Sequence, residues 1–233
     1  MHNSFTRSTV ALLLFAVNAH LSAAGESPVA SDALLQHISG DFELADGPAW
    51  DGWSLTVPDP FTEKAKRFVP SKDQWLPSLS GRRLSGSFYN HGVTWFVDNG
   101  KASILRLDAN REVTVIHQID LETDKTRKPN DLVVDRSGGV YFTLTRAGQV
   151  VYVPPGRPGF VAADDAQSAN GLILNPDESV LYVSEAGPKR ILAYDVGPGG
   201  KLTGRRVFAA MNDGQPDVKG ADGMAIDRAG NVY

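Results

Sequence analysis

The sequence predicts an all-β protein built as a β-propeller, and internal repetition is the main reason. Five segments share one pattern, in which a polar residue and a small or acidic residue precede two short β-rich runs. The first residues of these segments, here called the lead residues, are Asp46, Ser85, Asn130, Asn170 and Asp222, which lie 39, 45, 40 and 52 positions apart. A period of about 40–50 residues with four strands per repeat is typical of propeller blades.

The other elements of each repeat follow from shorter signals. Outer-strand candidates at 102–119, 148–163 and 190–210 each read as a β-rich run, a turn and a second β-rich run. The tetrads LVVD and LILN are apolar at nearly every position, which predicts strands buried on both faces. Residues 61–83 fit either an outer hairpin or a short helical turn. The tryptophans at 50, 53, 75 and 95 are expected to pack between blades.

Composition removes several classes of function. The chain has 233 residues, a formal net charge of −4 and no cysteine. Its scattered Lys and Arg residues argue against a nucleic-acid partner, because phosphate binding needs clustered basic side chains. The lack of cysteine excludes disulfides, cysteine-bound zinc and thiol catalysis. The G-x-S-x-G, H-E-x-x-H and G-x-G-x-x-G patterns are also absent from the sequence.

The N-terminus predicts export to the periplasm or the medium. Residues 1–24 hold one arginine, an apolar run at 9–17 and small residues before Ala24. That is the architecture of a signal peptide, and the run is too short to span a bilayer. We therefore predict a signal peptide at 1–24, an N-terminal lead segment at 25–39 and an incomplete propeller domain at 40–233, with no membrane association after cleavage.

In a propeller, the lead residues are expected to lie together at one end of the central channel. The first strand of each blade lines the central channel, so residues just before these strands are expected on one rim of that channel. Each pair taken alone, such as Asn-Gly or Asp-Gly, is also a common turn signal. Asp135 and Asp227 stand at the other end of their hairpins and are expected to be turn residues only.

Four motifs in order resemble the gluconolactonase and regucalcin (senescence marker protein) family. They are ADGPAWDG, RKPNDLVVDRSGGVYFT, ANGLILNPDESVLYVSEA and ADGMAIDRAGNVY, and the resemblance covers about residues 40–233. It implies a six-bladed propeller, of which about five blades are present in this chain, with a divalent metal in the channel and sugar lactones or related esters as substrates. At the observed period the remainder needs roughly 60–80 further residues, so the 233-residue chain is expected to be poorly stable and weakly active.

The resemblance also implies roles for individual residues. Asp46, Asn170 and Asp222 correspond to metal ligands, Asn130 to a contact with substrate or the attacking water, and Asp131 to its supporting neighbour. Two positions depart from the family pattern. Many members carry Glu at the position of Asp46, and many carry Arg at the position of Lys128, which we expect to bind substrate without the planar fork of an arginine.

The donor set predicts the chemistry. Carboxylate and amide oxygens favour hard cations, and Ca²⁺ suits flexible loop ligands best, with Mg²⁺, Mn²⁺ and Zn²⁺ as alternatives. The ion would polarise a lactone carbonyl, and a water would attack it with Asp222 as the proton acceptor and Asn130 orienting the reactants. We therefore predict a carboxylic-ester hydrolase that acts on a small-molecule lactone. The alternatives are a hydrolase of other esters and a non-catalytic ligand-binding propeller with a structural metal.

Overall fold

The computed structural model describes residues 32–34, 36–38, 41–122, 124–211 and 220–233. These residues form four four-stranded sheets, each an antiparallel meander, which are called blades 1 to 4 in chain order (β1–β4, β5–β8, β9–β12 and β13–β16). The first two sheets contain β1 (Ala49–Trp50), β2 (Leu55–Asp59), β3 (Lys64–Val69), β4 (Gln74–Ser80), β5 (Leu84–Asn90), β6 (Val93–Asp98), β7 (Ser103–Leu107) and β8 (Val113–Gln118). The next two contain β9 (Pro129–Val134), β10 (Val140–Leu144), β11 (Gln149–Val153), β12 (Phe160–Ala163), β13 (Ala169–Leu174), β14 (Val180–Glu185), β15 (Arg190–Val196) and β16 (Leu202–Ala210).

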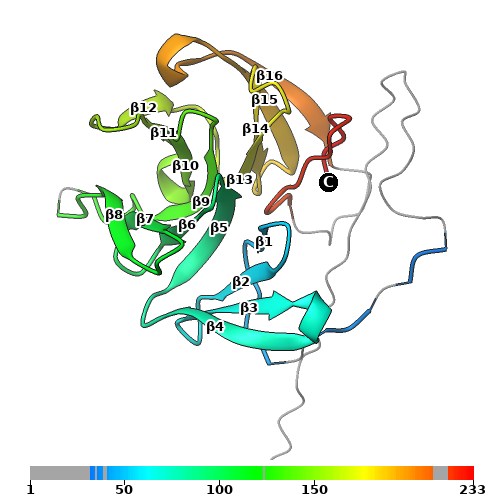
Figure 1. Ribbon diagram of the computed structural model, residues 1–233. Helices are drawn as coiled ribbons and strands as arrows, with labels where there is room; N and C mark the ends of the chain where they lie inside the picture. Colours follow the sequence, from blue (N-terminus) through cyan, green and yellow to red (C-terminus); the bar gives the residue numbers. More distant parts are fainter. Residues whose placement is uncertain (1–31, 35, 39–40, 123, 212–219) are drawn as a thin grey trace, which may run out of the picture.

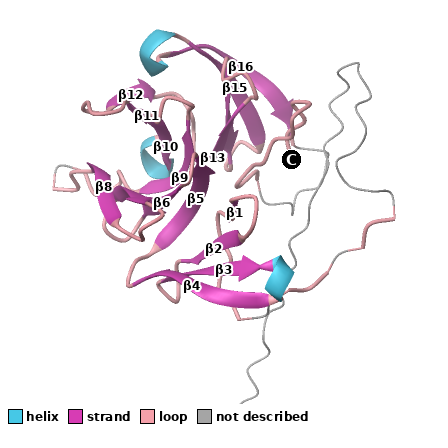
Figure 2. Ribbon diagram, in the orientation of Figure 1, coloured by secondary structure: helices cyan, strands magenta, loops and turns pink. Residues whose placement is uncertain are grey.

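The all-β prediction is confirmed, and the sheets are arranged as propeller blades. The helical elements of the described part are three 3₁₀ turns, at Pro70–Lys72, Thr145–Ala147 and Pro198–Gly200 (Figure 2). Strands β1, β5, β9 and β13 lie nearest the centre, and β4, β8, β12 and β16 lie at the periphery (Figure 1). Four blades are complete and the fifth repeat is represented by an isolated bridge between Ile226 and Val232, in agreement with the prediction of about five blades. No helix among the described residues is long and apolar enough to cross a membrane.

Packing between blades explains the apolar tetrads. On β9, Leu132 and Val134 belong to a cluster shared with blade 2, which includes Trp95 and Phe142. Their neighbour Val133 points the other way, into a cluster shared with blade 4. The strand is therefore buried on both faces, as its unbroken apolar run predicted.

Two expectations about blade 1 are settled by its outer hairpin and its tryptophans. Residues 61–83 form the hairpin β3–β4 around the 3₁₀ turn Pro70–Lys72, so both readings of this segment are correct in part. Trp95 is buried in a cluster shared with the next blade, as predicted, whereas Trp75 packs against Phe42 and against Phe68 of its own blade, so the prediction is not confirmed for Trp75. The prediction is wrong for Trp50 and Trp53, which are 53% and 84% exposed because they lie at and beside the β1–β2 turn.

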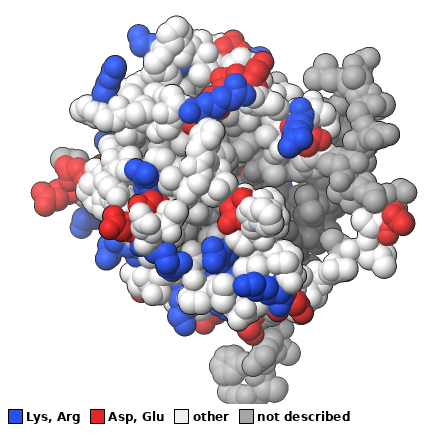
Figure 3. All heavy atoms as spheres, viewed as in Figure 1, with Lys and Arg blue, Asp and Glu red and all other residues white. Residues whose placement is uncertain are grey.

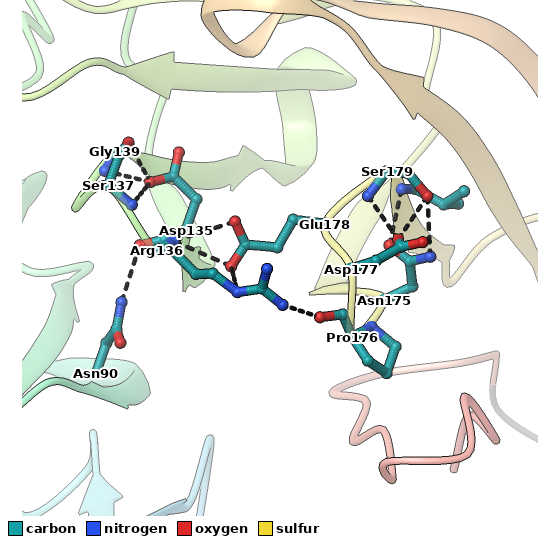
Figure 4. Close-up of polar contacts among 11 residues, drawn as sticks. Asn90, Asp135, Arg136, Ser137, Gly139, Asn175, Pro176, Asp177, Glu178 and Ser179 are labelled. Carbon is teal, nitrogen blue, oxygen red and sulfur yellow. Dashed lines mark hydrogen bonds and ion pairs between the residues drawn. The ribbon is translucent and has the colours of Figure 1, made fainter.

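The turns of the inner hairpins are tied together at one end of the channel, here called the turn rim (Figure 4). Asp135 accepts backbone hydrogen bonds from Ser137 and Gly139, each at 2.8 Å, which confirms it as a turn residue. Asp227 likewise accepts from the backbone of Ala229 and Asn231. Between blades, the Asn90 amide donates to the Asp135 carbonyl at 2.9 Å.

Candidate metal and active site

The lead residues gather at the other end of the channel, here called the mouth. Ser85, Asn130 and Asn170 are each the second residue of an innermost strand, so the prediction that they precede the strand is wrong by one or two positions. Asp46 does precede its strand β1, and Asp222 precedes the Ile226–Val232 bridge. Asp46, Asn130 and Asn170 are half-buried, while Asp222 is exposed.

A β-bulge explains the shifted strand boundaries. Pairing of β9 with β10 passes from Phe142↔Leu132 to Leu144↔Pro129, which leaves Asn130 and Asp131 together opposite Thr143. The same irregularity falls between Ala169 and Leu172 in β13 and between Leu84 and Gly86 in β5. A bulge re-aims side chains at the end of a strand, and here it does so at the same point of three neighbouring blades.

The innermost strands approach each other very closely at the mouth. A Cβ atom placed on Gly47 would lie 2.5 Å from the Cα atom of Gly86, and one placed on Gly86 would lie 2.7 Å from Oδ1 of Asp131. A Cβ atom on Gly171 would lie 2.3 Å from the carbonyl oxygen of Asp222. These contacts join the positions after the lead residues of the first three repeats, and likewise those of the fourth and fifth repeats.

Two hydroxyl residues of the mouth were not found by sequence reasoning. Thr143 on β10 donates to the carbonyl of Asn170 at 2.7 Å, and Ser184 on β14 donates to the carbonyl of Asp222 at 2.7 Å. Both side chains are fully buried. A signal existed in the sequence, because each is a hydroxyl residue that follows an apolar run in a second strand, in VYFTL and VLYVSE.

Electrostatics show that the carboxylates of the mouth act on one another. Burial, together with the negative charge of Asp222, raises the pKa of Asp46 to about 6, against the hydrogen bond from the Gly47 backbone. Burial also raises the pKa of Asp131 to about 7. The charges of Asp46 and Asp222 raise that pKa further, while the backbone N–H groups of Leu132 and Leu172 lower it. The charges of Asp46, Asp131 and Asp222, from the first, third and fifth repeats, thus influence one another at the mouth.

The chemistry of these donors fits a hard divalent cation. Asp46, Asn170 and Asp222 present only oxygen donors, and like-charged carboxylates in a partly buried site are stabilised by a cation between them. Within the described ranges, no three His, Cys, Asp or Glu side chains form a metal-binding group. The predicted set has only two carboxylates beside an amide, so it does not depend on such a group.

Lys128 stands apart from this arrangement. Its side chain is exposed, and it lines a surface pocket of about 690 Å³ together with Lys101, Gln118 and Leu121. The lining of that pocket includes none of the lead residues. Lys128 directly precedes β9, at the end of the loop that follows β8. Its side chain lies beside residues of this loop and not in the channel.

Comparison with known proteins assigns the chain to a family. The family model described as the SMP-30/Gluconolactonase/LRE-like region matches residues 44–233, which include every lead residue. The chain belongs to this family. The suspected resemblance is therefore confirmed over nearly all of the propeller.

Named relatives of this SMP-30/gluconolactonase family member are sugar lactonases. A gluconolactonase from Zymomonas mobilis is 26% identical over 237 residues, covering 85% of this chain and 66% of that protein. An L-arabinolactonase from Azospirillum brasilense is 27% identical over 126 residues, covering 49% of this chain and 40% of that protein. The solved structure of a gluconolactonase from Xanthomonas campestris is 27% identical with a TM-score of 0.65, covering 81% of this chain and 68% of that one. The chain thus spans about two thirds of the length of the Zymomonas relative.

Proposed function

We propose that this family member hydrolyses sugar lactones at the mouth of its channel, with a divalent cation held by Asp46, Asn170 and Asp222. The observation that carries the proposal is the close approach of the innermost segments at the mouth, at Gly47, Gly86 and Gly171, where the charge of Asp222 also contributes to the raised pKa of Asp46. Family membership and the sugar-lactonase relatives support the reaction class. The identity of the cation and the residue roles rest on donor chemistry.

The cation that best fits the site is Ca²⁺. All the donors are oxygens, and they lie in turns and bulges of different blades, which suits the tolerant coordination geometry of Ca²⁺ better than the strict octahedron of Mg²⁺. When bound, the ion would polarise the lactone carbonyl and offset the negative charge that develops on it.

In this proposal, side chains of the protein orient the reactants and accept the proton. Asn130, which is half-buried beside Asp131 on the bulge of β9, would orient a sugar hydroxyl or the attacking water. Asp222 is the proton acceptor because its carboxylate is the exposed one of the set. Asp131 supports Asn130, and Lys128 contributes to substrate binding only by contacting those parts of a substrate that extend beyond the channel.

The test is metal-dependent turnover of a lactone panel. Acid release from glucono-1,5-lactone and L-arabinono-1,4-lactone is followed in a pH-stat, with the spontaneous rate subtracted. We expect a chelator to abolish turnover, Ca²⁺ to restore it, and Asp222→Ala to lower kcat/KM by about 10²-fold or more. Asp227→Ala is the matched control, since it removes a carboxylate of the same repeat at the turn rim.

Two results would contradict the proposal. Turnover that ignores both the chelator and Asp222→Ala would remove the reaction from this site. Bound cation without turnover of any lactone would favour other esters first, and then a ligand-binding propeller with a structural metal.

We also propose that the protein is exported, on the basis of the signal-peptide pattern at 1–24, which lies outside the described residues. Expression in a Gram-negative host with fractionation, followed by mass spectrometry of the periplasmic product, tests this. A mature N-terminus after Ala24 supports export, and an uncut cytoplasmic product contradicts it.

A further inference from the structure

Along the mouth, each pair of successive described repeats is joined by a hydrogen bond from a side-chain hydroxyl. In each case a buried Ser or Thr side chain donates to a backbone carbonyl in the neighbouring repeat, at or directly after a lead residue. The four bonds run from Ser87 to Gly47 at 2.5 Å, and from Ser85 to Asn130, Thr143 to Asn170 and Ser184 to Asp222, each at 2.7 Å. One contact type thus recurs at all four junctions of the described repeats.

The junction between blades 3 and 4 shows what the hydroxyl connects. The backbone N–H of Asp131 donates to Oγ1 of Thr143 at 3.2 Å, and Thr143 in turn donates to the carbonyl of Asn170. The bulge makes this possible, because it turns the Asp131 N–H away from the ordinary strand ladder and towards the side chain. Thr143 therefore links the bulge of its own blade to the lead residue of the next.

The junction after blade 4 repeats the connection. The N–H of Gly171 donates to Oγ of Ser184 at 2.8 Å, and Ser184 donates to the carbonyl of Asp222. The Ser184 hydroxyl also lies 3.3 Å from the Gly171 carbonyl, and the shorter distance assigns its proton to Asp222. The Asn170 carbonyl and the Gly171 N–H belong to the same peptide group, so the two junctions join into one chain of hydrogen bonds.

We propose that Thr143 and Ser184 are positioning residues, which set the orientation of Asn170 and Asp222 through this chain of alternating hydroxyls and peptide groups. The inference rests on the proposed function for its consequence, namely that the lead residues bind a cation. The chain of hydrogen bonds is present whether or not a cation is bound. It extends from Ser85 and the Asn130–Asp131 peptide through Thr143 and the Asn170–Gly171 peptide to Ser184 and Asp222.

The order of donors and acceptors gives the chain a direction, from Ser85 towards Asp222, and burial strengthens its links. Thr143 and Ser184 are fully buried, so no bulk water competes for their bonds, and each donor–acceptor link polarises the next in such a low-dielectric setting. A hydroxyl that only joined two blades would affect only the groups to which it is directly hydrogen-bonded. A hydroxyl that positions the next lead residue must also change the behaviour of the peptide group beyond it.

Hydrogen exchange separates these two roles without a metal. In Thr143→Val the Asp131 N–H loses its acceptor and exchanges faster under either role. The Gly171 N–H keeps its own acceptor, Ser184, so only the positioning role predicts that it also exchanges faster, by about tenfold, as expected for a weakening of about 1.4 kcal/mol. The exchange of single amides is read by NMR at low temperature. Unchanged exchange at Gly171 would overturn the proposal.

Cation affinity tests the consequence on the folded protein. Ca²⁺, Mg²⁺ and Mn²⁺ are titrated by calorimetry, and we expect Thr143→Val and Ser184→Ala each to weaken the bound cation by about tenfold or more. Thr143→Ser keeps the hydroxyl and should restore affinity. Thr145→Val is the matched control, because Thr145 Oγ1 is buried without a hydrogen-bond partner among the described residues. Ser179→Ala, which removes a turn hydroxyl bonded to Asp177, serves the same purpose for Ser184.

The outcomes distinguish this inference from the proposed function. Lower thermal stability with unchanged affinity and unchanged Gly171 exchange would reduce Thr143 to a fastener between blades and overturn the inference. A wild-type protein that binds none of the three cations would overturn the proposed function instead, and the Gly171 exchange rate would still decide whether the chain positions the lead residues.

Discussion

The tightest residue-scale constraint at the mouth is the position directly after each lead residue. Four of these positions are glycines, at 47, 86, 171 and 223, and the remaining one is Asp131. At Gly171 an added Cβ atom would collide with the backbone of Asp222 and of Gly223, at 2.3 and 2.7 Å. Backbone atoms cannot swing aside as a side chain can, so this glycine is required by the approach of two blades.

Replacing Gly171 with Ala should therefore destabilise the fold. The extra methyl forces blade 4 and the fifth repeat apart, and overpacking of this kind costs about 1–3 kcal/mol, with the upper part of the range expected against backbone. Urea unfolding measures the change. Gly223→Ala is the control at the mouth, because a Cβ atom there meets nothing within 4 Å. Equal stability of the two variants would show that the blades are free to separate at this point.

At the scale of elements, the inner hairpin turns bind one another at the turn rim (Figure 4). The Arg136 backbone N–H donates to both carboxylate oxygens of Glu178, at 3.0 and 3.1 Å. The Arg136 side chain adds an ion pair to Glu178 at 3.6 Å and a hydrogen bond to the Pro176 carbonyl, but it is 65% exposed. Asp135, by contrast, receives two backbone N–H groups, the Ser137 hydroxyl and, at 2.6 Å, the hydroxyl of Tyr152.

These contacts predict unequal costs for two neighbouring substitutions. Asp135→Ala should lower the free energy of unfolding by about 2–3 kcal/mol, because it leaves several partly buried donors without an acceptor. Arg136→Ala should cost less than about 1 kcal/mol, since an exposed ion pair contributes little and the backbone bonds to Glu178 remain. Guanidinium unfolding of both variants checks the order. A larger loss in Arg136→Ala would mean that side chains, and not the turn backbone, hold the rim.

The sequence predicted those features that repeat and missed those that depend on a neighbouring blade. The spacing of Asp46, Asn130, Asn170 and Asp222 is periodic, so their common place at the mouth follows from the fold alone. Thr143 was missed because a hydroxyl within an apolar strand does not reveal its partner, and that partner, the Asn170 carbonyl, belongs to the next blade. The exposure of Trp53 was missed for the same reason, since propensity does not say which hairpin turn is covered.

At the scale of the whole molecule, both rims of the channel connect the blades. The mouth is joined by the hydroxyl chain, and the turn rim by the contacts of Asn90, Arg136 and Glu178. Between the rims lie the apolar clusters shared by blades 2 and 3 and by blades 3 and 4. Lys and Arg side chains are intermingled with Asp and Glu over the face viewed in Figure 3. The molecule is thus held by blade-to-blade contacts rather than by a central core.

A cation at the mouth should stabilise this whole assembly, because its proposed ligands Asp46, Asn170 and Asp222 come from the first, fourth and fifth repeats. Binding to the folded state alone adds about 2.7 kcal/mol when Ca²⁺ exceeds its Kd about 100-fold. A chain of this size gains about 2–4 °C in Tm per kcal/mol, so we expect Ca²⁺ to raise Tm by about 5–10 °C. Differential scanning calorimetry with Ca²⁺ and with chelator measures the shift.

Asp46→Asn should remove most of this Ca²⁺-dependent shift in Tm. Asp227→Asn, which makes the same change of charge at the turn rim, should keep the shift whatever its own baseline Tm. A shift that survives Asp46→Asn would show that the first repeat does not hold the cation, and the mouth would then lose its role as the point that ties the first repeat to the fifth.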